Sequence, residues 1–387
     1  MNFLKHIWAL LCDVRGQIPS SVTDNYDALL STTLRAYQTK LHDNITKGNK
    51  FINWLDSKGR FRKQEGGHQV SVPLMHQQNG TADIYSGYGL LDTTPQDGIT
   101  TAFYDWSQLS VSIAISRKEK RQNAGKSKIL DLLKAKTTQA EVSLKQKLNE
   151  CVLAGRITTT AGSDQIRVRV GELDSGASGP LPLGAIIDIT AARSVALGNI
   201  NGATYSFWQN QATDFGATAT FLALRNLMNR TYNNCSKGTA GVPDLMVGDQ
   251  IAWETYWLSM TQNERYIIDD KKTLDVLGGS DALKFRGATF VWDEIVPDPE
   301  TPYNPVDASG TAGIQHGGSA TASTIYFVNS ESMDYVVDSA TDFITTDFVR
   351  PENQDASVAQ ILWMGAVGTN NRRKNGVLYG ISQAITS

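Results

Sequence analysis

The chain has 387 residues and a formal net charge of −3, with 41% apolar and 19% charged residues. This length predicts two or three structural units with real cores, and the slightly acidic balance argues against a generally basic nucleic-acid-binding protein. Three cysteines lie far apart without a CxxC motif, which argues against a disulfide framework or a zinc site: Cys12, Cys151 and Cys235.

Residues 1–62 are predicted to form an N-terminal arm. Helices are expected at 2–14 and 24–46, although polar and basic residues dilute their apolar faces. We expect no signal peptide, because the apolar stretch is short and Cys12-Asp13 stands where a small-residue cleavage site would be. We also expect no membrane span, since no run of 18 apolar residues exists. An arm with so little apolar surface is expected to pack on something else.

Residues 63–116 are predicted to form an extended loop built as a two-stranded ribbon. The outgoing strand is QVSVPLM at 69–75 and the return strand is QLSVSIAIS at 108–116, both with apolar residues in alternation. About thirty residues lie between them, a length that is typical of functional or disordered loops. A lone two-stranded ribbon is only marginally stable in water, so we expect it to pack on another surface, which would be its own body in a monomer or a neighbouring copy in an assembly. The aromatic residues expected to make this inter-subunit contact are Tyr85, Tyr88, Phe103, Tyr104 and Trp106.

A long helix is predicted over 127–153. Ser127 is a suitable N-cap and Gly155 a suitable stop after the last turn. Its apolar stripe repeats at steps of four and seven and consists of Ile129, Leu133, Ala140, Leu144, Leu148 and Val152. A helix this long suggests a backbone element along one edge of the molecule.

The remaining elements alternate without a regular βαβ rhythm, which predicts an α+β fold. Strands are expected at 165–170, 184–189, 243–249, 282–297, 323–330 and 333–338, with helices at 216–235 and from Asp249 onward. Two further strands, QILWMGAVG and GVLYGIS, are expected to pair at the C-terminus through a tight turn at Asn375-Gly376.

Motifs for chemistry are weak throughout. The best candidate is AGKSK at 124–128, but a phosphate-binding loop would need glycine where Lys120 stands, so a capped helix start explains it better. The five histidines form no metal-binding pair and no GxSxG elbow exists. We therefore expect no catalytic residue, no cofactor and no metal. A nucleotide hydrolase that uses Lys126 remains the enzymatic alternative.

The stretch 117–136 is strongly basic, which suggests contact with phosphate or with an acidic neighbour. The same pattern also fits an ordinary solvated helix face. The residues singled out for such a contact are Arg117, Lys118, Lys120 and Arg121.

The order of these elements resembles the major capsid proteins of tailed bacteriophages, whose fold is shared with encapsulin shells and herpesvirus capsid floors. The segments that carry the resemblance are QVSVPLMHQQNGTADIYSGYGLLDT, SVSIAISRKEKRQNAGKSKILDLLKAKT, LGNINGATYSFWQNQ and GVPDLMVGDQIAWETYWL. The resemblance implies an N-terminal arm at 1–62, an extended loop at 63–116 and an axial domain at 216–344. It also implies a peripheral domain at 117–215 and 345–387 with the long helix as its spine.

The implied function is a structural one. The chain would assemble with itself into the hexamers and pentamers of an icosahedral shell around double-stranded DNA, mature from a procapsid, and reside in the virion after assembly in the host bacterial cytoplasm. A separate scaffolding protein and a portal are the implied partners, and no membrane is involved. One subgroup of the family cross-links subunits through a lysine on the loop; no lysine lies between Lys63 and Lys118, so we expect no such bond. An encapsulin-like nanocompartment shell is the alternative function.

Overall fold

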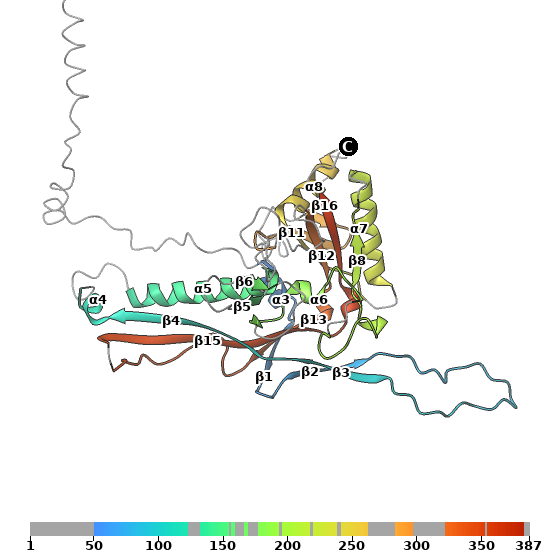
Figure 1. The fold of residues 1–387 in the computed structure, drawn as a ribbon, viewed down its shortest axis with the longest axis horizontal. Coiled ribbons are helices and arrows are strands. Elements are labelled where there is room, and N and C mark those ends of the chain that lie inside the picture. Colours follow the sequence, from blue (N-terminus) through green and yellow to red (C-terminus); the bar gives the residue numbers. More distant parts are fainter. Residues whose placement is uncertain are drawn as a thin grey trace, which may run out of the picture.

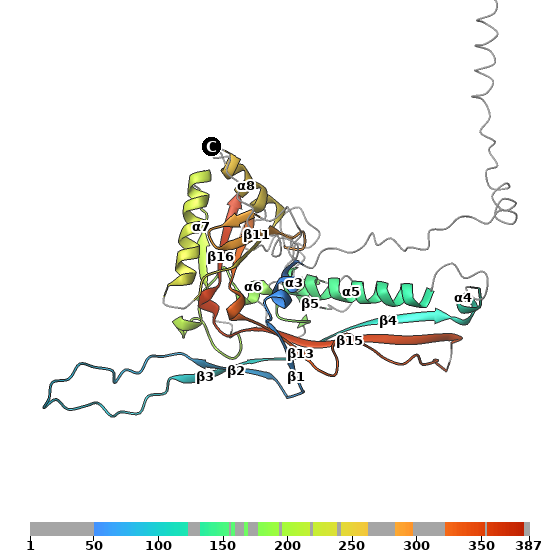
Figure 2. The same ribbon diagram turned by 180° about the vertical axis from the view of Figure 1, so that it is seen from behind.

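A computed structural model describes residues 50–122, 132–154, 156–158, 166–168, 177–192, 196–216, 220–237, 241–261, 283–296, 322–352 and 354–382. Figures 1 and 2 show an elongated molecule: a ribbon projects at one end, a long helix lies beside long strands toward the other, and a second sheet with two helices rises between them. The helices expected at 2–14 and 24–46, Ser127 and Gly155 fall outside the described residues.

A five-stranded sheet forms the long axis of the molecule. Its path runs β1 (Phe61–Gln64), β13 (Met333–Asp338), β15 (Ala356–Thr369) and β14 (Ile344–Thr345), and β4 (Ser107–Ser116) also pairs with β15. The whole of β4 runs antiparallel to β15, from Ser107 opposite Gly365 to Ser116 opposite Ala356. The expectation that 108–116 pairs with 69–75 is therefore wrong. Alternation fixes which face a strand buries, and the 14-residue β15 offers β4 a longer partner than the ribbon does.

The expected long helix is α5 (Leu132–Ala154), which lies along β4 (Figure 1). Its stripe of Ala140, Leu144, Leu148 and Val152 is buried in the main core, whereas Leu133 is exposed. The described helix before the ribbon is α3 (Lys50–Ser57), which sequence analysis did not identify. Its Phe51, Trp54 and Leu55 are buried in the same core, so this part of the expected arm belongs to the body.

The second sheet has six strands in the order β10-β11-β9-β12-β16-β8. They are β10 (Leu283–Phe285), β11 (Ala288–Trp292), β9 (Leu245–Gly248), β12 (Ala322–Val328), β16 (Gly376–Ser382) and β8 (Gln211–Asp214). Successive residues alternate between its faces: Met246 and Phe327 pack in a core with the helices, while Val247 and Tyr326 pack in the main core. The single strand expected over 282–297 is thus a hairpin with Arg286 at positive φ in its turn.

Two helices pack on this sheet: the one expected from Asp249 begins as predicted, whereas the one expected over 216–235 begins five residues later, at Phe221. The helix α7 (Phe221–Ser236) is capped by Thr220, whose side chain accepts from the Ala223 N–H. The helix α8 (Gln250–Thr261) is capped by Asp249, whose Oδ1 accepts from the Ala252 N–H at 2.8 Å. Within the described ranges, no helix combines the length and apolar character that crossing a membrane requires.

Of three further strand predictions, one is confirmed and two are wrong. A three-stranded sheet of β6 (Ile166–Val168), β5 (Arg156–Thr158) and β7 (Ala177–Ser178) contains the strand expected at 165–170. The strand expected at 184–189 is wrong, because α6 (Leu183–Ile186) is a short helix there. The expected C-terminal pair is also wrong: β15 and β16 lie in different sheets, and η5 (Arg372–Lys374) connects them.

The expected domain boundaries stay a prediction, and three strands bear on them. The strand β13 was expected in the axial domain but lies in the five-stranded sheet. The strands β8 and β16 were expected in the peripheral domain but lie in the six-stranded sheet. Because the chain crosses between the sheets several times, sequence ranges do not separate the two parts cleanly.

Candidate inter-subunit surface

The projecting ribbon consists of β2 (Val70–Met75) and β3 (Ile99–Tyr104). The strands are antiparallel, with Val70 opposite Tyr104 and Met75 opposite Ile99. Every second side chain of β2 is buried, as period-two alternation predicts, and these side chains join the main core: Val70, Val72 and Leu74. The base of the ribbon therefore packs against its own chain.

A loop at 196–200 secures the base of the ribbon. The Phe103 N–H donates to the Gly198 carbonyl at 3.2 Å, which extends the ribbon edge by one bond. Gly198 has φ +62, and a Cβ there would lie 3.0 Å from the Ala102 Cβ. Only glycine tolerates both the left-handed backbone and this close approach.

Tyr104 fastens the same base to the end of β15. Its hydroxyl donates to the Thr369 carbonyl at 2.6 Å, and the side chain is only 5% exposed. Burial raises the pKa of Tyr104 far above its ordinary value. The expectation that Tyr104 contacts a neighbour is thus corrected: its ring and its hydroxyl are both occupied within its own chain.

The other aromatic residues expected at the contact lie in three places. Phe103 is 39% exposed on the outer face of the base. Trp106 is half-buried at the bend between β3 and β4, and its Nε1–H donates to the Gly67 carbonyl at 2.9 Å. Tyr85 and Tyr88 are exposed in the loop 76–98, which we call the tip loop. Only these last two occupy the far end of the ribbon.

The tip loop presents apolar side chains to solvent. Ile84 is 97% exposed, although isoleucine is among the residues most often buried. The large exposed apolar side chains of the tip loop and the adjoining strand ends are Met75, Ile84, Tyr85, Tyr88, Leu90, Leu91 and Ile99. Sequence analysis chose the aromatic members and missed the aliphatic ones. These aliphatic residues could have been recognised as apolar residues without helical or strand periodicity inside a polar loop. Such a pattern favours a surface that binds a partner.

Short-range hydrogen bonds give the tip loop local shape. The Asn79 Oδ1 accepts from the N–H and the hydroxyl of Thr81, and the Asp92 Oδ1 accepts from those of Thr94. These bonds lower the pKa of Asp92, so its carboxylate is firmly ionised at neutral pH. Turns of this kind order the backbone locally but bury none of the apolar side chains.

The short helix α4 (Arg117–Gln122) stands at the opposite end of the long axis (Figure 1). It begins with a capping box: the Ser116 Oγ accepts from the Glu119 N–H, and the Ser116 N–H donates to the Glu119 carboxylate, both at 3.2 Å. Glu119 also binds the Lys136 ammonium at 3.1 Å, and this bond lowers its pKa. The Glu119 carboxylate of α4 is therefore already engaged by Ser116 and Lys136 of its own chain.

The basic residues expected to make an outside contact all lie on α4 and are exposed: Arg117, Lys118, Lys120 and Arg121. Arg117 shares Asp355 with Arg350, at 3.9 Å and 3.0 Å respectively. Within the described part of the chain, the other three cations make no ion pair. The structure thus brings the predicted basic residues together on one short helix.

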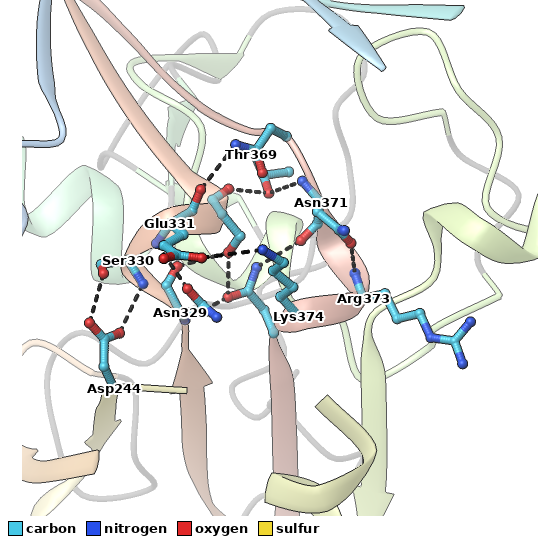
Figure 3. Close-up of polar contacts among 11 residues, drawn as sticks. Asp244, Asn329, Ser330, Glu331, Thr369, Asn371, Arg373 and Lys374 are labelled. Carbon is cyan, nitrogen blue, oxygen red and sulfur yellow. Dashed lines mark hydrogen bonds and ion pairs between the residues drawn. The ribbon is translucent and has the colours of Figure 1, made fainter. Parts of the chain in front are cut away.

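A polar joint of residues 329–332 and 369–375 connects the two large sheets (Figure 3). The Ser330 N–H and hydroxyl both donate to Asp244, at 2.9 Å and 2.7 Å. The Asn375 Oδ1 accepts from the Asn329 N–H and the Ser332 hydroxyl, each at 2.9 Å. The Lys374 ammonium lies 3.4 Å from the Glu331 carboxylate at the outer side of the joint. These bonds fix how β12 leads to β13 and how β15 leads to β16.

Arg372 of the joint is 2% exposed and inserts into the body. Its guanidinium donates to the carbonyls of Ile186, Trp208 and Ala185 at 2.8, 3.2 and 3.4 Å, and to the Asn210 Oδ1 at 3.1 Å. One side chain thereby satisfies acceptors on α6, on η2 (Ser206–Trp208) and ahead of β8. Sequence analysis treated this segment as a turn and missed its role.

The described residues offer little support for a metal site or a reactive cysteine. Among the residues that the structure describes, no three His, Cys, Asp or Glu side chains gather as a metal site would require. Lys126 and Ser127 of the AGKSK segment fall outside those residues. Burial raises the pKa of the Cys235 thiol to about 12, which keeps it protonated and unreactive at neutral pH.

Comparison with known proteins identifies the architecture. No protein-family model matches the sequence, and no curated protein is similar to it. Among solved structures, the capsid of cyanophage A-1(L) superposes with a TM-score of 0.62 and 13% identity, covering 92% of this chain and 98% of that one. The cyanophage Pam1 capsid gives a TM-score of 0.53 at 13% identity, again covering 92% and 98%.

An encapsulin also matches. The SrpI encapsulin of Synechococcus elongatus PCC 7942 superposes with a TM-score of 0.51 and 10% identity, covering 93% of this chain and 96% of that one. At such identities the agreement concerns the fold, and it extends over nearly the whole length of both chains. The α+β fold of this chain is therefore the one that these phage capsid subunits and the encapsulin share.

Proposed function

We propose that the chain is a major capsid protein, which assembles with itself into the hexamers and pentamers of an icosahedral shell around a double-stranded DNA genome. The observation that carries the proposal is the tip loop, which projects from a capsid fold with large apolar side chains that the described part of the chain leaves uncovered. The work of such a protein is binding between copies, and no set of described side chains suggests catalysis.

The energetics of the ribbon favour assembly. Burying one large apolar side chain stabilises by about 1.5–3 kcal/mol, so several such residues on one loop make a strong driving force for contact. The base of the ribbon is already packed, so the loop is presented outward and not collapsed on the body. A contact between different surfaces of identical copies is head-to-tail, and such contacts close into rings when the rotation permits.

Further partners follow from the same reading. We infer a separate scaffolding protein, a portal and maturation from a procapsid, with assembly in the host bacterial cytoplasm before the shell becomes part of the virion. The exposed cations of α4 support contact with packaged DNA or with an acidic partner.

The test is the assembly state of the expressed chain. We expect capsomers or closed particles by sedimentation and negative-stain electron microscopy. Replacing Tyr88 and Leu90 of the tip loop with serine should reduce particle yield severely, because both side chains are exposed in the single chain. Replacing Thr93 with serine in the same loop is the matched control and should leave the yield unchanged. A stable monomer whose tip loop at 76–98 resists protease would overturn the proposal.

An encapsulin-like nanocompartment shell is the second candidate, favoured by the match to the encapsulin of Synechococcus elongatus. The two functions differ in what the particle encloses. Ultraviolet absorbance of purified particles and the neighbouring genes separate them: DNA with terminase and portal genes supports a phage head, whereas one cargo enzyme supports a nanocompartment.

A further inference from the structure

We propose that Asn79 in the tip loop is a self-modification site, at which the Gly80 backbone nitrogen attacks the Asn79 side-chain amide. The reaction releases ammonia and, after water opens the cyclic intermediate, leaves aspartate or isoaspartate at position 79. The N–H and the hydroxyl of Thr81 both donate to the Asn79 Oδ1 and promote the attack. The modification goes beyond the proposed shell function and does not depend on it.

The chain contains three Asn-Gly dipeptides, at 79–80, 201–202 and 375–376. Asparagine followed by glycine favours this reaction, because glycine has no side chain to shield its backbone nitrogen or to restrict the rotation that the attack requires. The structure places the three dipeptides in different environments: Asn79 and Gly80 are exposed, Asn201 is half-buried, and Asn375 is buried. The two sites outside the tip loop therefore serve as internal comparisons for the first.

The turn around Asn79 holds the groups that the reaction needs. The Thr81 N–H donates to the Asn79 Oδ1 at 3.0 Å and the Thr81 hydroxyl donates to the same atom at 2.7 Å. When the Gly80 nitrogen attacks, negative charge develops on this oxygen, and donors that are already in place stabilise such charge. The Ala82 N–H closes the turn on the Asn79 carbonyl at 3.3 Å. Among the described residues no group accepts the Gly80 N–H, so the attacking nitrogen is not engaged.

The dipeptide at 201–202 has only part of this arrangement. The Asn201 Oδ1 accepts from the Ala203 N–H at 2.8 Å, but alanine stands where the tip loop has threonine, so no hydroxyl follows at this position. Gly202 is buried, and its carbonyl accepts from the Gln209 Nε2 at 2.6 Å. One donor fewer and a fastened glycine should make Asn201 react more slowly than Asn79.

The dipeptide at 375–376 has two donors but cannot move. The Asn375 Oδ1 accepts from the Asn329 N–H and the Ser332 hydroxyl, each at 2.9 Å, and the residue is 0% exposed. Gly376 begins β16, which pairs with a strand on either side. Its nitrogen cannot rotate toward the Asn375 side chain without breaking the joint, and burial keeps out the water that the second step requires. We therefore expect this site to be inert in the folded chain.

The reaction balances with water as the only co-reactant. In the first step a bond forms between the Gly80 nitrogen and the Asn79 Cγ, and the bond from Cγ to Nδ2 breaks. The Gly80 proton passes through solvent to the leaving nitrogen, so ammonia departs and a cyclic imide remains. In the second step water adds to one of the two imide carbonyls. Opening at Cγ gives aspartate, whereas opening at the backbone carbonyl gives isoaspartate, and nothing is oxidised or reduced.

The product changes the charge of the tip loop. Its carboxylate joins those of Asp83, Asp92 and Asp97 in a loop that contains no lysine or arginine. The Asp92 Oδ1 accepts from the N–H and the hydroxyl of Thr94, so an aspartate can hold the same turn. Isoaspartate lengthens the backbone by one carbon and shifts that turn. Under the proposed function, the added charge would lie among apolar side chains that bind a second copy, where an unpaired charge is costly to bury.

Mass spectrometry of peptides from the full-length chain tests the proposal. Free subunits are incubated in mildly alkaline buffer, below any concentration at which particles form, and conversion is followed at all three dipeptides. In the folded chain Asn79 should convert about fivefold or more faster than Asn201, and Asn375 should stay unmodified. In urea the three rates should agree within about threefold, because only the local sequence then acts.

Two substitutions isolate the role of the hydroxyl. Thr81→Val removes the hydroxyl and keeps the N–H and the side-chain shape, so conversion of Asn79 in the folded chain should slow about fivefold, with no change in urea. Thr81→Ser keeps the hydroxyl and is the matched control, expected to react within about twofold of the parent. Protection of Asn375 in each variant reports that the chain is folded.

Each possible result bears on the proposal. Conversion of Asn79 no faster than Asn201 in the folded chain would refute the site. Equal rates for the parent and Thr81→Val would refute the role of Thr81 and assign the reaction to exposure alone. None of these measurements depends on particles, so a chain that modifies itself but never assembles would remove the shell function and leave this inference standing.

Discussion

Replacing Arg372 with methionine should destabilise the chain strongly, because this one side chain joins three segments in the core. Methionine has a similar length and packs well, but it donates no hydrogen bond. Three backbone carbonyls and the Asn210 Oδ1 would lose a donor at 2.8–3.4 Å in a site that is 2% exposed. Each buried acceptor left unpaired costs about 1–3 kcal/mol, while removal of the buried charge returns part of its desolvation, so we expect a net loss of about 3 kcal/mol.

The assay is urea unfolding followed by tryptophan fluorescence, with every variant at the same subunit concentration because association adds to apparent stability. Arg373 supplies the matched control, because it is the next residue and it is exposed. Among the described residues its side chain makes no hydrogen bond, while its backbone N–H donates to the Asn371 Oδ1. Arg373→Met should change the free energy of unfolding by no more than about 0.5 kcal/mol. Equal unfolding midpoints for the two variants would refute the role assigned to Arg372.

Three further predictions concern the core. Burial raises the pKa of Asp293 from 3.8 to about 6, so the folded state holds the proton more tightly and stability falls as pH rises through this range. The variant Asp293→Asn keeps an acceptor for the Ile295 N–H. It should be more stable than the parent above pH 6, by up to about 3 kcal/mol, and no more stable below pH 4. A pH series of unfolding midpoints in which the two proteins do not diverge would count against this prediction. Tyr104→Phe should cost about 1 kcal/mol in thermal or urea unfolding, because the Thr369 carbonyl loses its donor; an unchanged midpoint would contradict this. The variant Gly368→Ala should lower the free energy of unfolding by about 1–3 kcal/mol, since its Cβ would lie 2.8 Å from the Tyr104 ring. Hydrogen exchange at the base of the ribbon should rise in this variant. Unaltered exchange there would contradict the prediction, because the Tyr104 ring would then have moved aside without loosening the base.

Several elements could be predicted from the sequence because their signals are local. The helix α8 begins one residue after Asp249, as its capping residue predicted, whereas the start of α7 was placed five residues too early because the cap Thr220 was not recognised. Four residues of the apolar stripe of α5 are buried as their spacing predicted, namely Ala140, Leu144, Leu148 and Val152, whereas Leu133 near the helix start is exposed. Strands β9, β12 and β13 likewise stand on short apolar runs. Local chemistry determines these elements, and tertiary contacts confirm them.

Strand partners could not be predicted in the same way. The alternation in β4 indicates which side chains face inward, but it is equally compatible with β2 or β15 as a neighbour. The true partner lies about 240 residues further along the chain, beyond the reach of any local pattern. The same reasoning explains why Asn375-Gly376 suggested a hairpin: the dipeptide favours a tight turn, but buried bonds from Asn375 to residues 329 and 332 hold it in the joint.

The candidate surface was predictable only in part for a related reason. Tyr85 and Tyr88 are exposed as expected, whereas Tyr104 points into the core, because inward and outward positions alternate along β3 and the register depends on β2. Ile84, Leu90 and Leu91 carry no periodic signal, so only the structure shows that nothing in the described chain covers them.

The division of the ribbon into a packed base and an uncovered tip bears on how assembly would proceed. Tyr104, Gly198 and the buried side chains of β2 fix the direction of the ribbon within a single copy. A neighbour would then have to order only the tip loop, whose turns at Asn79 and Asp92 already restrict its backbone. Binding costs less conformational entropy when the bound shape exists beforehand, so more of the apolar burial at the tip remains as net affinity. Under the proposed function, the packed base of the ribbon keeps the free subunit folded. The exposed apolar side chains of the tip loop then remain available for contact with a second copy.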